Sequence, residues 1–398
     1  MKQLIFYGAG RYAQRNLDEC IKNGLTPVCF VDSDKRKHYT KLGGGYDILP
    51  LNKAMEMYPD ATLCITARNY WVDIYDYIKN QGIPSSRIAS IVNNKLVKDA
   101  QYPQYCHLIG HDLMLDGSGI STCCKIGYRT TIASDGNIKK DIIKYNEFVN
   151  RLRDDLTQGK LTGCTGCPEL RDGIESEKMS VKHVIIGTAL PGHQSCNFKC
   201  SYCTYELEVK KVWDSRTDSV VDIFQEIESI SSIDTISYIS GEISVSPFKY
   251  EIINIWNKNG WGGWINTNAS IYIYEMAKLA SKYNIILVIS LDAGTKETFN
   301  KIKGVDCFEK VIENIKKYSI HGVPICLKYV LLENINGDEH NLFSFVRIAK
   351  EMNANVQIVR DFKNMKIISQ YEHSAMIKLT NKCLEMGVPV NFNDHCTS

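Results

Sequence analysis

The sequence lacks the features that mark several broad classes of protein. It has no apolar run near the ~20 residues that a membrane-spanning helix requires, and its N-terminus, MKQLIFYGAG, carries neither a basic leader nor a small-residue cleavage site. Its 47 Lys and Arg residues are balanced by 45 Asp and Glu, so the net charge of +2 provides no field of one sign to hold a nucleic-acid backbone. We therefore expect a cytoplasmic protein that binds neither membranes nor nucleic acids.

Common catalytic signatures are also missing, since the sequence shows no Walker loop, no HExxH motif and no Ser–His–Asp ordering. What is abundant is cysteine, with 15 residues, an odd number that cannot all pair into disulfides. In a reducing compartment such cysteines more often serve metal sites or redox chemistry. Eight of them lie between residues 106 and 203. Of the scattered ones, five stand in apolar contexts and are expected in the core: Cys20, Cys29, Cys64, Cys326 and Cys383.

The length of 398 residues allows two to four domains at ~100–200 residues each, and we predict three: 1–97, 98–182 and 183–398. In the first, strands and helices alternate, which predicts a parallel sheet. In its motif GxGxxA, Gly8 and Gly10 let the backbone approach a pyrophosphate, and Asp32 stands where a carboxylate binds a ribose. The competing interpretation is a tight turn in a docking domain. The region resembles the small Rossmann-like domains of polysaccharide and nucleotide-sugar metabolism, which implies a nucleotide or nucleotide sugar as its ligand.

The second domain, 98–182, has short strands and turns with little to fill a core, so a metal or disulfide staple is expected. Its separated cysteines suit tetrahedral zinc or a [4Fe–4S] cluster about equally by spacing alone. The segment resembles a SPASM-type auxiliary iron–sulfur domain, although it precedes the catalytic domain instead of following it. The resemblance implies an auxiliary [4Fe–4S] cluster held by Cys106, Cys123, Cys164 and Cys167. Cys124 is the alternative to Cys123 in this ligand set.

The third domain opens with CxxxCxxC after an apolar strand: Cys196, Cys200 and Cys203. Three thiolates bind three irons of a [4Fe–4S] cube and leave the fourth iron open to a chelating ligand. With the aromatic residues Phe198 and Tyr202 between the cysteines, this spacing resembles the radical S-adenosylmethionine (SAM) superfamily. The resemblance implies that the open iron is chelated by the amino and carboxylate groups of SAM, and that one electron cleaves SAM to a 5′-deoxyadenosyl radical.

Polar residues follow the later strands of this domain and fit the same resemblance. Ser240, Gly241 and Glu242 resemble the glycine–glycine–glutamate motif that receives the SAM ammonium, with serine replacing the first glycine. Other strand ends suit contacts to SAM or substrate: Ser290, Asp292 and Asn334. In a parallel barrel such strand ends share one rim. We therefore predict an α/β protein whose residues 183–398 form a partial (β/α)6 radical SAM barrel, preceded by the Rossmann-like domain and a small irregular cluster-binding domain.

The expected function is hydrogen-atom abstraction from an unactivated C–H bond, giving oxidation or epimerisation, with electrons from a donor such as flavodoxin or ferredoxin. The Rossmann-like domain favours a sugar, a nucleotide sugar or another small polar metabolite as substrate, although this is a fold-level analogy. A peptide-modifying enzyme is the alternative, and a non-enzymatic zinc or iron–sulfur module that senses redox state or SAM is the alternative of another class. No residue stands out as the donor or acceptor of a second hydrogen.

Overall fold

The computed structural model describes residues 3–67, 71–92, 95–98, 102–116, 119–123, 131–134, 136–175, 179–187, 196–203, 219–239, 241–361 and 368–393. Cys124 and Ser240, both named above, lie outside these ranges. The chain divides into two compact units, one formed by Met1–His111, Ile120–Ala133 and Ile142–Met179, the other by Asp112–Gly119, Ser134–Asp141 and Ser180–Ser398. Most of the segment 98–182 thus belongs to the first unit.

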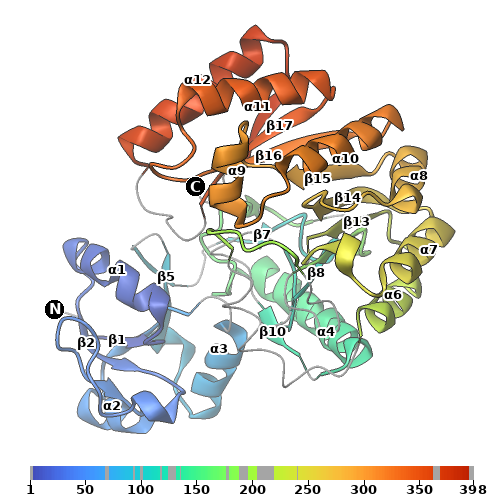
Figure 1. Ribbon diagram of the computed structural model, residues 1–398. Coiled ribbons are helices and arrows are strands. Elements are labelled where there is room, and N and C mark those ends of the chain that lie inside the picture. Colours follow the sequence, from blue (N-terminus) through green and yellow to red (C-terminus); the bar gives the residue numbers. More distant parts are fainter. Residues whose placement is uncertain are drawn as a thin grey trace. The chain divides into compact units, whose positions relative to one another are not determined.

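The first unit contains a six-stranded sheet in the order β3-β2-β1-β4-β5-β6. Figure 1 labels β1, β2 and β5 of this sheet. Its strands are β1 (Leu4–Tyr7), β2 (Pro27–Val31), β3 (Ile48–Leu49), β4 (Thr62–Ile65), β5 (Ile88–Val92) and β6 (Lys95–Val97). All neighbours pair in parallel except β6, which runs antiparallel to β5. Because this is the strand order of doubly wound dinucleotide-binding folds, the predicted parallel-sheet domain at the N-terminus is confirmed.

Both faces of this sheet are covered. Ile5 and Tyr7 of β1 enter one apolar cluster, and the alternate residues Leu4 and Phe6 enter another. The helix α1 (Arg11–Lys22) packs on the second cluster, while α2 (Leu51–Met57) and α3 (Trp71–Asn80) pack on the first. The period-two alternation in a four-residue strand therefore distributes the core to two layers of helix.

The rest of the first unit has little regular structure, as predicted. Its short strands are β7 (Gln104–Tyr105), β9 (Gly119–Ser121), β10 (Thr131–Ala133) and β11 (Arg171–Asp172). The exception is the long helix α4 (Ile138–Thr157), which buries Tyr145, Phe148, Leu152 and Leu156.

The second unit contains eight parallel strands in the order β8-β12-β13-β14-β15-β16-β17-β18. They are β8 (Asp112–Asp116), β12 (His183–Ile186), β13 (Thr235–Tyr238), β14 (Gly262–Thr267), β15 (Ile286–Ser290), β16 (Ile325–Leu331), β17 (Asn355–Arg360) and β18 (Val390–Asn393). Between them run α6 (Val220–Glu228), α7 (Lys249–Asn259), α8 (Tyr274–Tyr283), α9 (Lys296–Lys303), α10 (Phe308–Ile320), α11 (Glu339–Glu351) and α12 (Gln370–Glu385).

The predicted α/β class and parallel sheet are confirmed in this unit, with one addition. The six strands of the predicted partial (β/α)6 barrel form, and β18 is a seventh. An eighth, β8, pairs with β12 although it lies in the segment assigned to the irregular domain. Its five residues, DLMLD, carry too short a pattern to be distinguished from a hairpin strand, and the partner that stabilises it is about 70 residues away in the chain.

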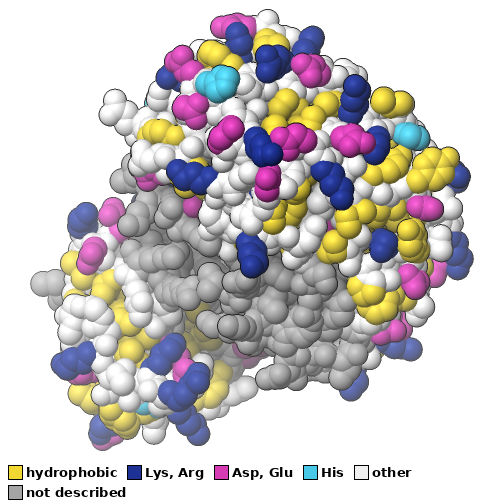
Figure 2. All heavy atoms as spheres, viewed as in Figure 1, with side chains coloured by type: hydrophobic (Ala, Val, Ile, Leu, Met, Phe, Trp, Pro, Cys, Tyr) yellow, Lys and Arg dark blue, Asp and Glu magenta, His cyan; other side chains and the backbone are white. Residues whose placement is uncertain are grey.

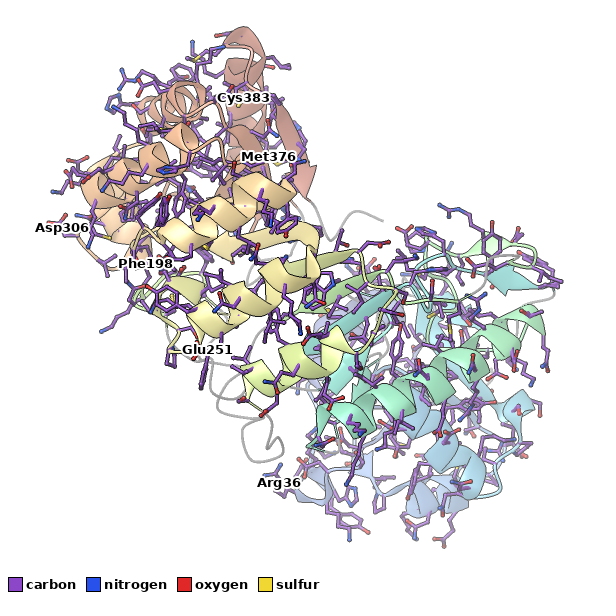
Figure 3. The ribbon with its side chains drawn as sticks, turned by 90° about the vertical axis from the view of Figure 1, so that its right-hand side faces the viewer. Arg36, Phe198, Glu251, Asp306, Met376 and Cys383 are labelled. Atoms are coloured by element: carbon purple, nitrogen blue, oxygen red, sulfur yellow. The ribbon has the colours of Figure 1, made fainter. Side chains whose placement is uncertain are left out.

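The cysteines expected in the core are there, since Cys20, Cys29, Cys64, Cys326 and Cys383 are all buried; Cys383 is labelled on α12 in Figure 3. Basic and acidic side chains are interleaved on the face shown in Figure 2. Within the part of the chain that the structure describes, we find no helix both long and apolar enough to cross a bilayer.

Candidate functional site

The loop that carries Cys196, Cys200 and Cys203 is attached to the end of α9. The backbone N–H of Lys199 donates to the carbonyl of Lys303 at 3.0 Å, and that of Ser201 donates to the carbonyl of Ile302 at 2.9 Å. Phe198, labelled in Figure 3, packs edge-on against Phe299 with 6.0 Å between ring centroids. The backbone between the first and third cysteines is therefore held by a helix C-terminus.

The three thiols lie within electrostatic range of one another. Desolvation raises the pKa of Cys196 to about 11, and the charges of Glu242, Cys200 and Cys203 contribute to the increase. Desolvation also raises the pKa of Cys200, while the ammonium of Lys303 opposes the increase. Since a metal takes the thiolate form, loading this loop with iron would release protons.

A buried network joins the cysteine loop to the end of β15. The hydroxyl of Tyr202 donates to Asp292 Oδ2 at 2.6 Å, and Lys303 Nζ donates to the same oxygen and lies 3.0 Å from the Tyr202 hydroxyl. The side chains of Asp292 and Lys303 are 0% and 1% exposed. Burial would lower the pKa of Lys303, but the charges of Asp292 and Cys200 outweigh it and the pKa is raised. The network therefore holds an ion pair beside the thiols.

Asp292 is committed to the protein in this arrangement. Besides the two donors on Oδ2, its Oδ1 accepts the backbone N–H of Val330 at 2.7 Å. The residue has a left-handed backbone, with φ of 59°. We conclude that Asp292, predicted from the sequence as a SAM contact, orients the cysteine loop. Its partner Lys303 was missed, and the only sequence signal was a lysine in the last turn of a helix, which usually faces solvent.

Glu242 lies at the end of β13 with 1% exposure. Its Oε1 accepts the backbone N–H of Ser244 at 3.0 Å and the Thr267 hydroxyl at 2.7 Å, and its Oε2 accepts the backbone N–H of Asn268 at 2.5 Å. Desolvation raises the pKa of Glu242, and these hydrogen bonds reduce the increase. Since a carboxylate offers about four acceptor positions, about one remains on Oε2.

Asn268 connects this carboxylate to the cysteine loop. Its Nδ2 donates to Asn197 Oδ1 at 2.9 Å and lies 3.9 Å from Cys196 Sγ. Gly241, next to Glu242, has φ of 48°, a conformation that favours glycine. The strand ends of β13 and β14 therefore lie beside the first cysteine.

Ser290 and Asn334, which the sequence also predicts as contacts to SAM or substrate, are placed differently from each other. Ser290 ends β15 and pairs with Lys328 of β16, so both side chains lie on one face of the sheet. Asn334 is exposed in the turn after β16, with φ of 59°. The residue that supports the site is Asn336, which is fully buried and donates from Nδ2 to the carbonyl of Asp292 at 3.0 Å. Turn geometry, which the sequence does not reveal, decides between the two asparagines.

The first unit brings its four predicted cysteines to one small cavity. The cavity is lined by Cys106, Leu108, Ile109, Thr122, Cys123, Cys164, Cys167, Glu169 and Leu170. Desolvation raises the pKa of Cys106, and the charges of Cys167 and Glu169 contribute to the increase. Across the described ranges, no three His, Cys, Asp or Glu side chains are arranged to hold a single metal ion.

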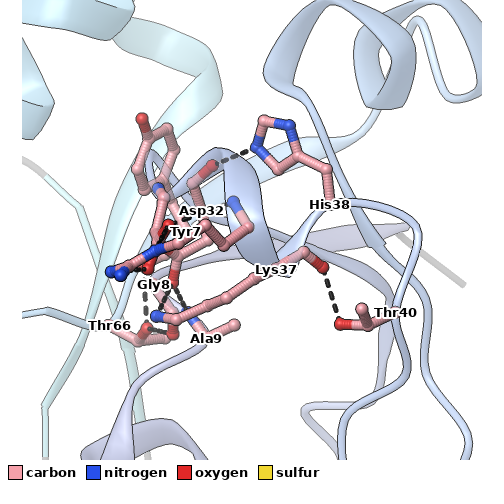
Figure 4. Close-up of polar contacts among 10 residues, drawn as sticks. Tyr7, Gly8, Ala9, Asp32, Lys37, His38, Thr40 and Thr66 are labelled. Carbon is pink, nitrogen blue, oxygen red and sulfur yellow. Dashed lines mark hydrogen bonds and ion pairs between the residues drawn. The ribbon is translucent and has the colours of Figure 1, made fainter.

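The glycine turn of the first unit lies where the strand order reverses, between β1 and β4 (Figure 4). Gly8 has φ of 109°, and a Cβ there would lie 3.0 Å from Thr66 Oγ1. Asp32 Oδ2 accepts the backbone N–H of Ala9 at 2.8 Å and the ammonium of Lys37 at 2.8 Å. A Cβ at Gly10, by contrast, meets nothing within 4 Å. Asp32 therefore stabilises the turn, whatever else it binds.

An Asp–His–Ser chain that the sequence did not indicate joins β8, β12 and β13. His183 Nδ1 lies 3.4 Å from Asp112 Oδ1, and His183 Nε2 lies 2.5 Å from Ser237 Oγ. Ser237 has no exposed surface, so its hydroxyl is out of reach of a substrate. We assign this chain a structural role.

Residues 191–346 match the family model of the Radical SAM superfamily. The matched range contains the cysteine motif from which the resemblance to the same superfamily is drawn.

Curated proteins and solved structures give further similarities. A probable GTP 3′,8-cyclase from Saccharolobus islandicus is 27% identical over 164 residues, which cover 40% of this chain and 51% of that protein. One from Thermococcus kodakarensis is 25% identical over 167 residues, which cover 42% and 53%. The chain thus spans about half the length of the curated relatives it matches. The crystal structure of Streptococcus suis SuiB aligns with a TM-score of 0.43 and 14% identity, covering 66% of this chain and 56% of that one.

Proposed function

We propose that this chain, whose residues 191–346 belong to the radical SAM superfamily, is an enzyme that cleaves SAM reductively and abstracts a hydrogen atom from an unactivated C–H bond of its substrate. The observation that carries the proposal is the attachment of the cysteine loop. Two backbone hydrogen bonds and the buried Tyr202–Asp292–Lys303 network hold three thiols at the carboxyl ends of parallel strands. In parallel α/β folds, active sites are built at these strand ends.

The donor set fits an iron–sulfur cluster with one open iron. Cys196, Cys200 and Cys203 would hold three irons, because thiolates are the usual protein ligands of such clusters. When bound, the cluster supplies the electron that cleaves SAM, and SAM supplies the hydrogen-abstracting group. An electron donor such as flavodoxin or ferredoxin would reduce it.

In this proposal, residues that follow β13 and β15 bind and orient SAM. The open acceptor position on Glu242 Oε2, together with the backbone at Gly241 and Ser240, would receive the SAM ammonium. Ser290 at the end of β15 would contact the SAM carboxylate or ribose. Asp292 and Tyr202 would act by fixing the loop, since their polar atoms are already occupied by each other and by Lys303.

The four thiols of the first unit support an auxiliary [4Fe–4S] cluster held by Cys106, Cys123, Cys164 and Cys167. All four side chains line the same cavity, although they come from three separate segments. Such a cluster would accept an electron from the substrate during oxidation, or return one during epimerisation. A zinc site is the alternative with the same ligands.

A sugar or nucleotide-sugar substrate remains our preferred class. Support comes from the strand order of the first unit and from Gly10, where the turn leads into α1 and where a Cβ would meet nothing within 4 Å, so the space beside the backbone is open to a phosphate. The curated relatives are named probable GTP 3′,8-cyclases, and GTP is also a nucleotide. Modification of a peptide is the second candidate.

Anaerobic reconstitution with iron and sulfide tests the proposal. The protein, given SAM and dithionite, should produce 5′-deoxyadenosine, whereas a variant with Cys196, Cys200 and Cys203 replaced by Ala should produce none. Cys307→Ala, which removes a thiol outside both predicted clusters, is the matched control and should retain the activity. Equal deoxyadenosine from the triple variant would refute the proposal.

A further inference from the structure

Among the residues that line the four-cysteine cavity, one buried side chain has a polar atom without a hydrogen-bond partner in the described part of the chain. Thr122 lines the cavity between the thiols and is 0% exposed. Among the residues that the structure describes, its Oγ1 has no hydrogen-bond partner. A buried hydroxyl without a hydrogen-bond partner costs folding free energy unless a ligand provides the partner. Thr122 therefore indicates that a group bound in the cavity offers a hydrogen-bond acceptor.

Other hydroxyls nearby are satisfied by the protein itself. Ser121 Oγ donates to the carbonyl of Cys123 at 3.4 Å. Thr162 Oγ1 accepts the backbone N–H of Cys164 at 3.2 Å and lies 3.3 Å from Thr165 Oγ1. These groups shape the two cysteine-bearing segments. Thr122 differs because it lines the cavity while its hydroxyl has no hydrogen-bond partner among the described residues.

The acceptors that four cysteines would bring into this cavity are sulfur atoms. We propose that the Thr122 hydroxyl donates a hydrogen bond to a sulfur of the auxiliary cluster and raises its reduction potential; this rests on the auxiliary cluster proposed above. The physical reason is that reduction adds negative charge to the cluster, and a donor aimed at its sulfur stabilises that charge. Thr122 is thus a residue that tunes the cluster and does not ligate it.

Glu169 provides an opposing effect in the same cavity. Glu169 is one of the lining residues, and its negative charge acts on the thiol of Cys106. A negative charge that acts on a ligand of the cluster disfavours the reduced cluster and lowers its potential. Thr122 and Glu169 therefore shift the reduction potential of the cluster in opposite directions. Substitution of Glu169 is thus an internal control for substitution of Thr122.

The experiment uses a parent variant in which Cys196, Cys200 and Cys203 are Ala, so that iron enters only the four-cysteine cavity. After anaerobic reconstitution, iron and sulfide are counted and the midpoint potential is measured by a redox titration followed by electron paramagnetic resonance (EPR). Thr122→Val removes the hydroxyl with little change of shape and should lower the potential at unchanged iron content. Thr122→Ser should stay near the parent, and Glu169→Gln should shift the potential upward.

A spectroscopic measurement separates tuning from packing. In D2O the backbone amides of Leu108 and Ile109 at Cys106 also contribute exchangeable deuterons, so the diagnostic signal is one additional deuteron coupling in the reduced parent, which should be lost in Thr122→Val and kept in Thr122→Ser. If Thr122→Val fails to load, Thr122→Ala provides a second hydroxyl-free variant. Fully loaded hydroxyl-free protein with the parent's potential and coupling would overturn the inference alone. A parent that loads no iron, or loads zinc, would overturn the auxiliary cluster and the inference with it.

Discussion

The two cysteine sets of this protein are built in different ways. Cys196, Cys200 and Cys203 lie in one short loop, which is held by the end of α9 and by the buried pair of Asp292 and Lys303. The four cysteines of the cavity come from three segments, and only packing of those segments brings them together. A local motif can leave an iron open because the loop has no fourth cysteine to offer. A set assembled by packing can close all four positions, which suits electron transfer more than catalysis.

The largest effect that separates the two sets should come from removing the loop thiols. Replacing Cys196, Cys200 and Cys203 by Ala should abolish SAM cleavage and reduce the iron content from about eight to about four atoms per chain. Iron analysis and a deoxyadenosine assay check this. A variant that loses all its iron would show that the cavity does not load independently.

The complementary change should leave the chemistry in place. Cys164→Ala together with Cys167→Ala should halve the iron while SAM is still cleaved, because the loop is anchored within the second unit. Thermal unfolding of the first unit should begin at lower temperature, since a metal bound only by the folded state stabilises it. Loss of SAM cleavage would instead mean that the cavity is a folding staple for the whole chain.

The loop's anchor can be broken without touching a cysteine. Lys303→Met leaves the carboxylate of Asp292 buried without its partner, which should cost about 3–5 kcal/mol of unfolding free energy, measured by chemical denaturation. Lys296→Met is the control on the same helix. Its ion pairs with Asp306 and Glu309 are on the surface, so the unfolding free energy should stay close to that of the parent. Equal stability of the two variants would contradict the buried network.

A smaller effect is expected at the carboxylate proposed to receive SAM. Glu242→Gln removes a charge-assisted hydrogen bond worth roughly 1.5–3 kcal/mol, so SAM should bind about 10 to 100 times more weakly. Iron content should stay level, because Glu242 is not a thiol ligand. Equilibrium binding of SAM to the reconstituted protein measures this, and unaltered affinity would exclude Glu242 from the SAM site.

The smallest effect concerns the first unit. Gly8→Ala places a Cβ 3.0 Å from Thr66 Oγ1 at a backbone angle that favours glycine, so the turn must shift. Gly43→Ala, in a different loop of the same unit, has open space around the added Cβ and is the control. If the turn binds a nucleotide, Gly8→Ala should weaken binding of UDP or UDP-glucose in a calorimetric titration far more than Gly43→Ala. Absence of binding in the parent would favour a docking domain.

Local patterns predicted what depends on local structure. The cysteine motif, the alternation of strands and helices and the polar strand end at Glu242 could be recognised because spacing and periodicity determine them. Cys106 and Cys123 lie far from Cys164 and Cys167 in the sequence, and spacing alone does not group the four. All four nevertheless line the same cavity.

What the sequence did not predict depends on contacts between distant residues. Lys303 has the pattern of a surface lysine at a helix end, and only the tertiary fold brings its ammonium to Asp292, which follows β15. Asn336 and Asn334 are chemically identical, and the turn decides which one is buried. The strand β8 requires β12 as its partner. In each case, contacts that form only in the folded chain determine the placement of the residue or strand, and local propensity does not predict those contacts.

The central claim is that one cysteine set holds a cluster with an open iron and the other does not. The most direct test is the EPR spectrum of the reduced protein with and without SAM, recorded for two complementary variants. In the variant lacking Cys164 and Cys167, SAM should change the spectrum, because it ligates the open iron of the loop cluster. In the variant lacking Cys196, Cys200 and Cys203, the spectrum should not respond. A SAM-dependent change in the second variant, or none in the first, would contradict the account.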